Sequence, residues 1–377
     1  MANSWRVLYV VYGGFLGGAE RSILDCAAAL ARNGEFDVLV ACTSSTAVWD
    51  KAVEQGLQTF ALRFPVLEGL HGAAGIARSA SGVVSTGLCL RQMVQRQHVN
   101  LVHANGVKAV LPAVVGAKLA GAPLVFHARD YPRQRALHRI VSAMAAATIV
   151  PSRFIGNAMP SSRSKLHVVP NGVDFPPLRP AQGKIRKSLG LDPQTVVITT
   201  VAQLVPWKRQ DLFLEAAAIV AQRHAKTHFC LVGSDIWQRN GNYQEALRRL
   251  AAAPSLVGKV TFLGHCSDVG DIISDSDILV LPSDNEPFGR VVVEAWHYGA
   301  AMVSADGSGP EEIIENGRTG YLFRRGSAAD LATVLERLIS DPSLRNRCCL
   351  EGYKQCGLYP VERCARAVSD IYRGILQ

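Results

Sequence analysis

The strongest constraint on the fold of this chain is a regular alternation of short apolar segments with longer helical ones. The first predicted strand is 7–11, followed by a helix at about 18–32; the alternation continues to residue 150 and restarts at residue 196. Such a rhythm is typical of parallel sheets with crossover helices. The sequence therefore predicts an α/β chain of two doubly wound, Rossmann-like domains that face each other across a cleft.

A proline-rich segment separates the two series. Val168-Val-Pro-Asn-Gly-Val-Asp174 is followed by Pro176, Pro177 and Pro180, which predict a stiff, turn-rich connector. We therefore place an N-terminal domain at residues 1–175 and a C-terminal domain at residues 176–359. The last helical pattern, within residues 360–377, has apolar residues at helical spacing and is expected to pack back on the first domain.

Composition narrows the class of protein. No apolar run approaches the roughly 18 residues that a membrane-spanning helix needs. The opening apolar segment carries a single basic residue and runs into a glycine turn, so we interpret it as a strand rather than a signal peptide. The nine cysteines include no CxxC pair and predict reduced thiols in a cytoplasmic protein, with no metal site.

The net charge of +9 is confined to the first half of the chain. Residues 1–180 carry 18 Lys and Arg against 9 Asp and Glu, and the remainder carries 22 against 22. This asymmetry predicts an anionic partner, either the inner membrane surface or a phosphorylated substrate, and not nucleic acid. A solvated basic face is the alternative. The candidates for acceptor or membrane contact are Arg129, Arg133, Arg135 and Arg139.

One segment of the second half carries a more specific pattern. In Glu286-Pro-Phe-Gly-Arg-Val-Val-Val-Glu294, two carboxylates flank a Phe-Gly turn directly after a predicted buried strand. Glu286 is then expected in the strand-to-helix loop, and Glu294 about one turn into the next helix. Loops at the carboxyl ends of parallel strands are where such sheets bind ligands. The alternative is a helix-start acid at Glu286 and a solvated helix position at Glu294.

Two further loops are candidates for binding phosphate. Gly17 and Gly18 follow the first strand and open a helix, so their backbone amides can approach an anion. A tight turn without a ligand is the alternative. The spacing G-G-x-x-G-G lacks the dinucleotide fingerprint and disfavours a nicotinamide-dependent dehydrogenase. Lys208 and Arg209 follow a strand that begins near residue 196, where a lysine can bind a diphosphate; a lysine without function is the alternative.

These motifs resemble those of the retaining glycosyltransferases of family 4, whose two domains form the GT-B fold. The resemblance covers nearly the whole chain, from the glycine-rich loop through Pro170-Asn-Gly-Val-Asp174 and the Lys208 loop to Gly309–Phe323. It implies that Lys208 binds the donor diphosphate. It also implies that Glu294 contacts the ribose, that Glu286 contacts the donor sugar, and that His127 lies beside the transferred sugar. The implied catalytic residues are Glu286, His127 and Lys208, and the implied donor-binding residues are Gly17, Gly18, Gln203, Lys208, Arg209, Phe288, Gly289, Arg290, Val291 and Glu294.

One position departs from the pattern of that family, which usually has arginine where this chain has Gln203. A neutral amide can donate to a phosphate oxygen but does not neutralise it. We hypothesise that Arg209 or Arg290 supplies the missing charge. The sequence Asp275-Ser-Asp277 suggests a metal site in another glycosyltransferase fold, but its place just before a strand favours turn chemistry here.

The predicted function is transfer of a sugar, with retention and without a metal, from a nucleoside-diphosphate sugar to an acceptor hydroxyl. A lipid-linked or cell-surface glycan is the expected acceptor, as in polysaccharide biosynthesis, with peripheral association at the membrane. A soluble small-molecule acceptor is the alternative. A non-catalytic nucleotide-sugar binding protein is an alternative from a different class.

Overall fold

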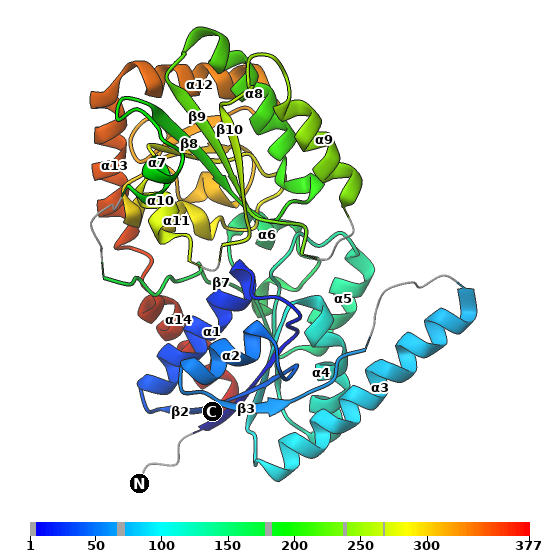
Figure 1. Cartoon of the computed structure of the whole chain (residues 1–377). Coiled ribbons are helices and arrows are strands. Elements are labelled where there is room, and N and C mark those ends of the chain that lie inside the picture. Colours follow the sequence, from blue (N-terminus) through cyan, green and yellow to red (C-terminus); the bar gives the residue numbers. More distant parts are fainter. Residues whose placement is uncertain (1–4, 66–71, 178–182, 237–239, 267) are drawn as a thin grey trace. The chain divides into compact units, whose positions relative to one another are not determined.

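The computed structural model describes residues 5–65, 72–177, 183–236, 240–266 and 268–377 (Figure 1). The chain divides into a first unit, Met1–Asp174 with Tyr359–Gln377, and a second unit, Phe175–Leu358. Each boundary lies one residue from the predicted one. Of the predicted connector, Pro180 lies outside the described residues.

The first unit is built on a seven-stranded sheet with the strand order β3-β2-β1-β4-β5-β6-β7, and every neighbouring pair is parallel. The strands are β1 (Trp5–Val11), β2 (Phe36–Cys42), β3 (Gln58–Ala61), β4 (Leu101–Asn105), β5 (Leu124–His127), β6 (Ala147–Val150) and β7 (Leu166–Val168). The helices are α1 (Gly18–Arg32), α2 (Ala47–Glu54), α3 (Gly72–Arg96), α4 (Gly106–Ala120), α5 (Arg135–Met144), α6 (Arg153–Ala158), the 3-10 turn η1 (Arg163–Lys165) and α14 (Val361–Leu376).

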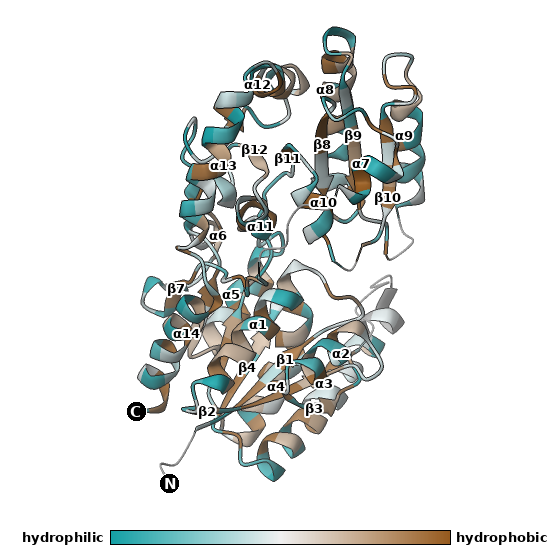
Figure 2. Cartoon of the chain, turned by 60° about the vertical axis from the view of Figure 1, so that its left-hand side comes forward, coloured by the Kyte–Doolittle hydropathy of each residue, from teal (hydrophilic) through white to brown (hydrophobic). Residues whose placement is uncertain are grey.

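The period of two along each strand assigns the two faces of this sheet. Val7, Tyr9 and Val11 of β1 pack into a core with α1, α2 and α14. Leu8 and Val10 face the opposite side, in a core formed with α3, α4, α5 and α6. Both faces are therefore covered, as the near-continuous apolar strands predict. Figure 2 shows the apolar colouring concentrated along these strands.

The last helix of the chain belongs to the first unit. Val361, Ala365, Val368 and Tyr372 are buried at helical spacing, and α14 packs against α1. The first residue of α14, Val361, lies close to Gly172. A Cβ added at Gly172 would be 2.5 Å from the Cα of Val361, so only glycine fits there. The segment after Val168 is thus packed against the start of α14.

The second unit contains a six-stranded parallel sheet with the order β10-β9-β8-β11-β12-β13. Its strands are β8 (Val196–Val201), β9 (Thr227–Val232), β10 (Val260–Gly264), β11 (Ile278–Leu281), β12 (Ala301–Ala305) and β13 (Tyr321–Phe323). Its helices are α7 (Lys184–Ser188), η2 (Pro206–Lys208), α8 (Gln210–Arg223), α9 (Gly241–Ala251), α10 (Gly270–Ser274), α11 (Arg290–Tyr298), η3 (Gly309–Glu312), α12 (Ala328–Ser340) and α13 (Pro342–Cys356).

Helices cover both faces of this sheet as well. Residues of α8, α9, α12 and α13 form one core with the strands, and residues of α7 and α10 lie on the other side. Within the described ranges, no helix combines the length and the apolar character needed to cross a bilayer.

Candidate functional site

Three loops meet at the carboxyl end of the second sheet. They follow β8, β11 and β12, and backbone hydrogen bonds join them. The amide of Asp284 donates to the carbonyl of Trp207 at 2.8 Å, and the amide of Gly309 donates to the carbonyl of Glu286 at 2.8 Å. These bonds bring together residues that lie on separate loops, at the edge of the sheet where doubly wound folds bind ligands.

Lys208 and Glu286 form an ion pair at this edge. Lys208 ends η2, and its Nζ donates to Glu286 Oε2 at 2.6 Å, with side-chain exposures of 15% and 12%. The same Nζ lies 4.0 Å from the centre of the Trp207 ring. A lysine held between a carboxylate and an aromatic face is fixed in place. A phosphate that approached Lys208 would compete with Glu286 for it.

The Phe-Gly turn sets the start of α11. Gly289 has φ 84°, and an added Cβ would lie 2.9 Å from Pro310 Cγ, so both conformation and space favour glycine. Phe288 is 2% exposed and anchors the turn. Gly289, the N-cap residue, has no side chain to cap the first amides of the helix, and Val291 in the first turn is half-buried. The amide end of this helix therefore suits an anionic group.

Glu294 lies one turn into the same helix, as predicted. The Nε of Arg290 donates to its Oε1 at 2.8 Å, and the two side chains are 13% and 19% exposed. The carboxylate is thus oriented by its neighbour on the helix. Its second oxygen adds acceptor capacity for a hydroxyl.

Arg209 is held at the start of α8 in an unusual conformation. Its φ is 54°, in the left-handed region, and its Nε lies 3.2 Å from both oxygens of Asp211. Its Nη1 is 3.5 Å from Asp284 Oδ2. Asn285, in the neighbouring loop, also has a positive φ, of 52°. Non-glycine residues in this region are strained by about 1–3 kcal/mol each and cluster at functional sites.

Four buried polar atoms at this edge have no hydrogen-bond partner among the described residues. They are Thr200 Oγ1, Gln203 Nε2, Ser283 Oγ and Ser308 Oγ. They occur near the carboxyl end of β8 or in the segments that follow β8, β11 and β12. A buried polar group without a partner is rare in native proteins, and a missing ligand is one explanation. Within the described part of the chain, Gln203 thus presents an amide donor without a partner at the position where the family it resembles usually has arginine.

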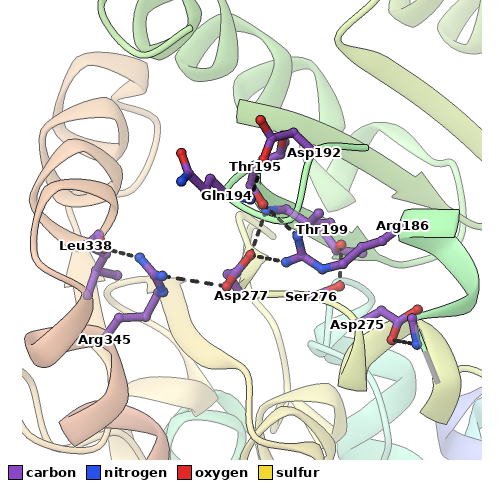
Figure 3. Close-up of polar contacts among 12 residues, drawn as sticks. Arg186, Asp192, Gln194, Thr195, Thr199, Asp275, Ser276, Asp277, Leu338 and Arg345 are labelled. Carbon is purple, nitrogen blue, oxygen red and sulfur yellow. Dashed lines mark hydrogen bonds and ion pairs between the residues drawn. The ribbon is translucent and has the colours of Figure 1, made fainter. Parts of the chain in front are cut away.

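Asp275 and Asp277 lie at the amino end of β11, at the opposite edge of the sheet (Figure 3). Asp275 accepts from the amides of Gly183 and Ile185 at 2.9 and 2.8 Å. Asp277 accepts from the amide of Val197 at 2.8 Å and also forms two ion pairs. These reach Arg186 at 2.5 Å and Arg345 at 3.6 Å.

These carboxylates line a cavity of about 380 Å³ with both arginines. Because each carboxylate is bonded to backbone amides or arginines, the arrangement connects α7, β8 and α13 to the start of β11 (Figure 3). The turn and packing interpretation of Asp275-Ser-Asp277 accounts for both carboxylates.

In the first unit, a carboxyl group, that of Glu20, lies against the glycine loop. The carboxylate of Glu20 accepts from the amide of Gly17 at 3.1 Å, next to Gly18 at the start of α1. Burial raises the pKa of Glu20 to about 7, although the backbone hydrogen bonds oppose this shift. An anionic ligand at Gly17 and Gly18 would meet this carboxyl group, which the sequence prediction did not include.

His127 ends β5, and its ring is 1% exposed. Its Nδ1 lies 3.1 Å from His103 Nε2, and its Nε2 is buried without a partner among the described residues. Burial, and then the positive charge of Arg129, hold the pKa of both histidines well below the usual value. Both rings are therefore neutral.

Arg129 differs from the other arginines with which it was grouped. Its side chain is 6% exposed, with Nε donating to Asn105 Oδ1 at 2.7 Å and Nη1 to Asn171 Oδ1 at 2.5 Å. A buried guanidinium cannot belong to an exposed basic face, so its assignment to a membrane contact is wrong. It follows β5 directly and is turned into the carboxyl edge of the sheet, whereas Arg133, Arg135 and Arg139 are exposed.

Several residues of these two edges were not among the predicted site residues: Glu20, His103, Asn105, Asn171, Thr200, Asp211, Ser283, Asp284, Ser308 and Tyr372. His103 and Asn105 carried a usable signal, because each is a polar residue near the carboxyl end of an apolar strand, like His127. The others depend on contacts between distant segments.

Comparison with known proteins identifies related sequences for both units. The family model described as "Glycosyltransferase Family 4" matches residues 16–175, and that described as "Glycosyl transferases group 1" matches residues 181–355. A D-inositol 3-phosphate glycosyltransferase of Rhodococcus opacus is 30% identical over 214 residues, which cover 56% of this chain and 48% of that protein. The chain spans about half the length of such curated relatives.

Solved structures resemble the chain over its whole length. Anabaena Alr3699/HepE, in complex with UDP and glucose, has a TM-score of 0.83 and 22% identity, with 98% of this chain and 100% of that chain covered. The lipopolysaccharide outer core galactosyltransferase WaaB, in its apo form, has a TM-score of 0.70 and 17% identity, with coverage of 98% and 99%. The likeness confirms the predicted fold class, an α/β chain of GT-B type with two doubly wound sheets.

Proposed function

The chain belongs to glycosyltransferase family 4, and from this premise we propose that it transfers a sugar from a nucleoside-diphosphate sugar to an acceptor hydroxyl. The observation that carries the proposal is the carboxyl edge of the second sheet. There, two cation–carboxylate pairs accompany four buried polar atoms that have no partner in the described part of the chain.

The donor's diphosphate is the group that this edge fits best. Lys208, the side-chain amide of Gln203, which has no partner among the described residues, and the first amides of α11 all offer positive charge or hydrogen-bond donors. At an effective dielectric near 20, a lysine about 4 Å from a phosphate gains roughly 4 kcal/mol before desolvation. Displaced from Lys208, Glu286 would be available to sugar hydroxyls, and Glu294 to the ribose diol. The UDP complexes of Anabaena HepE support a donor of this type.

Retention is proposed to proceed by attack on the face from which the diphosphate leaves. In the ligand-free protein the carboxylates of Glu286 and Glu294 are each bound to a cation, an arrangement that suits hydroxyl binding more than nucleophilic attack. The leaving phosphate would accept the acceptor's proton, while the protein orients both substrates and stabilises the developing negative charge. This mechanism requires no metal.

The first unit is proposed to bind the acceptor, a lipid-linked or cell-surface glycan. The surface of α5 supports this choice, because the helix carries exposed arginines at 135 and 139 together with Ile140 and Met144, which are 58% and 38% exposed, and exposed Arg133 precedes it. Residues 131–173 include no Asp or Glu. Basic and apolar side chains on one helix suit an anionic membrane surface, where the protein would bind peripherally at the cytoplasmic face.

A small phosphorylated acceptor is the second candidate. The name of the Rhodococcus opacus relative favours it, since D-inositol 3-phosphate is a small anion. Basic residues of the first unit would bind such a phosphate as readily as a lipid headgroup. Vesicles that contain anionic lipid separate the two candidates: sedimentation of the wild type with them, lost in Arg135→Glu, supports the first.

The test of the function itself starts with a thermal-shift screen of nucleotide sugars, because a ligand that binds the folded state raises its melting temperature. The stabilising donor is then incubated with lipid-linked and soluble acceptors. Release of nucleoside diphosphate only when acceptor is present distinguishes a transferase from a binding protein. Full activity in both Lys208→Ala and Glu294→Gln would reject the proposed donor site.

A further inference from the structure

Four aromatic side chains form a continuous hydrogen-bonded chain inside the first unit. The hydroxyls of Tyr9 and Tyr372 are 2.7 Å apart, the Tyr372 hydroxyl is 2.5 Å from His103 Nδ1, and His103 Nε2 is 3.1 Å from His127 Nδ1. All four side chains are at most 1% exposed. The chain of bonds ends at His127 Nε2, the buried atom without a partner among the described residues.

The fold accounts for this alignment. Tyr9 and His103 are register partners on β1 and β4, their rings stack with centroids 4.6 Å apart, and His127 follows on β5. Tyr9 lies on the sheet face that α14 covers, and α14 supplies Tyr372. Tyr372 also packs edge-on against Phe36 at 5.4 Å. The packing of α14 thus places the Tyr372 hydroxyl against His103, although the two residues are far apart in sequence.

The bonds must all run in one direction. A neutral imidazole has one nitrogen that donates and one that accepts, so the role of one nitrogen determines the role of the other. If His103 accepts at Nδ1, it donates from Nε2. His127 then accepts at Nδ1 and carries its hydrogen on Nε2. The reverse direction would leave His127 Nε2 as an acceptor.

The chemistry of the Tyr372–His103 contact favours the first direction. A phenol is a stronger acid than a neutral imidazole N–H, and an imidazole nitrogen is a stronger base than a phenol oxygen. The single hydrogen of the Tyr372 hydroxyl has two acceptors within reach, the Tyr9 oxygen at 2.7 Å and His103 Nδ1 at 2.5 Å. Because the imidazole nitrogen is the stronger base, Tyr372 donates to His103 Nδ1, and the Tyr9 hydroxyl, whose hydrogen can rotate, donates to Tyr372. His127 is left with Nε2–H as a donor at the carboxyl end of β5.

We propose that His103 and Tyr372 are positioning residues that fix the tautomer of His127, so that Nε2–H is held ready to donate to a substrate oxygen. That the oxygen belongs to a sugar rests on the proposed function; the tautomer is a property of the ligand-free protein. In this proposal α14 has a role beyond covering the sheet, because its Tyr372 hydroxyl sets the polarity of a histidine at the edge where the acceptor is proposed to bind.

The direct test is nitrogen NMR of the imidazole rings in ligand-free protein labelled at histidine, with His127→Gln used to assign the signal. We expect a single neutral tautomer of His127 with the hydrogen on Nε2. A hydrogen on Nδ1 in the wild-type protein would overturn the proposal, whatever the enzyme's activity. This measurement needs no substrate, so it can be read even if the proposed function fails.

Two variants that remove only a hydroxyl extend the test. In Tyr372→Phe the donor to His103 is lost, and we expect a mixture of His127 tautomers. In the matched control Tyr9→Phe, an equally buried hydroxyl is lost that does not contact His103, and we expect the wild-type tautomer. An unchanged tautomer in Tyr372→Phe would overturn the proposal.

Kinetics of Tyr372→Phe then test the role of the tautomer in transfer. We expect kcat to fall by about three- to tenfold, which is the range for one hydrogen bond, with the KM for the donor unchanged. A purely structural defect would instead lower the melting temperature and the fraction of active protein, leaving kcat per folded molecule unchanged. A mixed tautomer with unchanged kcat would refute the proposed role in transfer, while absence of turnover in the wild type would refute the proposed function alone.

Discussion

The carboxyl edges of the two sheets hold their charged groups in different ways. At the edge of the second unit, Lys208, Arg209 and Arg290 each contact a carboxylate of the same or a neighbouring segment. At the edge of the first unit, Arg129 is bound by the amide oxygens of two asparagines, next to the neutral His127. The second edge is rich in ion pairs, whereas at the first edge the buried Arg129 is hydrogen-bonded to neutral amide groups.

The two arrangements differ in how readily their charged groups can change partners. An ion pair that is partly exposed can trade one anion for another, so a diphosphate can replace Glu286 as the partner of Lys208 at modest net cost. A buried network has little freedom to rearrange, and it fixes the direction in which its donors point. The second unit is therefore suited to capturing a charged donor, and the first to orienting hydroxyl groups.

The largest expected effect comes from Lys208→Ala, which removes the exchangeable cation. We expect kcat/KM for the donor to fall about 100- to 1,000-fold, the range seen when one stabilising group is removed from a transition-state site. Lys226→Ala is the control, because Lys226 pairs with Asp192 in the same unit but both side chains are at least half exposed. Equal activity of the two variants would show that the Lys208–Glu286 pair is only structural.

The next effect tests the buried network of the first unit. Arg129→Met leaves two buried asparagine oxygens without their donor, and we expect a loss of about 2–4 kcal/mol in the free energy of unfolding. Arg133→Met, at an exposed position nearby, should change it by less than about 0.5 kcal/mol. Chemical denaturation of both variants measures their free energies of unfolding. Similar losses in the two variants would show that the buried Arg129 contributes no more to stability than an exposed arginine.

Compensation for Gln203 predicts a smaller effect in the second unit. If Arg209 or Arg290 supplies the charge that arginine would bring, alanine at one of them should weaken donor binding by about tenfold. Titration calorimetry with the donor measures it, with Arg223→Ala as the control because Arg223 forms an exposed pair with Glu336. Unchanged affinity in both Arg209→Ala and Arg290→Ala would refute compensation.

The smallest effect is a pH dependence of the first unit. The pKa of Glu20 is about 7 in the folded protein, above the ordinary value of 4.5. The folded state therefore binds more protons than the unfolded state between these values, so stability falls as pH rises from about 4.5 to 7. We expect the free energy of unfolding to fall by about 1 kcal/mol over this pH range, because the carboxyl is partly exposed and solvent weakens the effect. Melting curves at several pH values measure this loss. Glu20→Gln should flatten this part of the profile; an unchanged slope would contradict the assignment.

The alternation of strands and helices was sufficient to predict much of the fold. The first helix was expected at about residues 18–32 and extends over Gly18–Arg32, because a glycine turn and an amphipathic pattern mark its ends. The loop position of Glu286 and the helical position of Glu294 followed from the same local signals. These features are determined by residues that are close in sequence, so the local sequence pattern is enough to predict them.

Contacts between distant segments could not be predicted in this way. Lys208 and Glu286 are 78 positions apart, and His103 and Tyr372 are 269 apart, so their pairing depends on how strands are ordered and where the last helix packs. Arg129 was grouped with its exposed neighbours because four arginines within eleven residues look alike in sequence. Its burial follows from its place at the end of β5, where Asn105 and Asn171 bind it.

The central claim is that the carboxyl edge of the second sheet binds the nucleoside-diphosphate part of the donor. Hydrogen–deuterium exchange with and without UDP tests it most directly. We predict protection of the loops after β8, β11 and β12, with the peptides around Lys208, Gly289 and Ser308 responding together. Protection confined to the opposite edge, at Asp275 and Asp277, or to the glycine loop of the first unit, would contradict the claim.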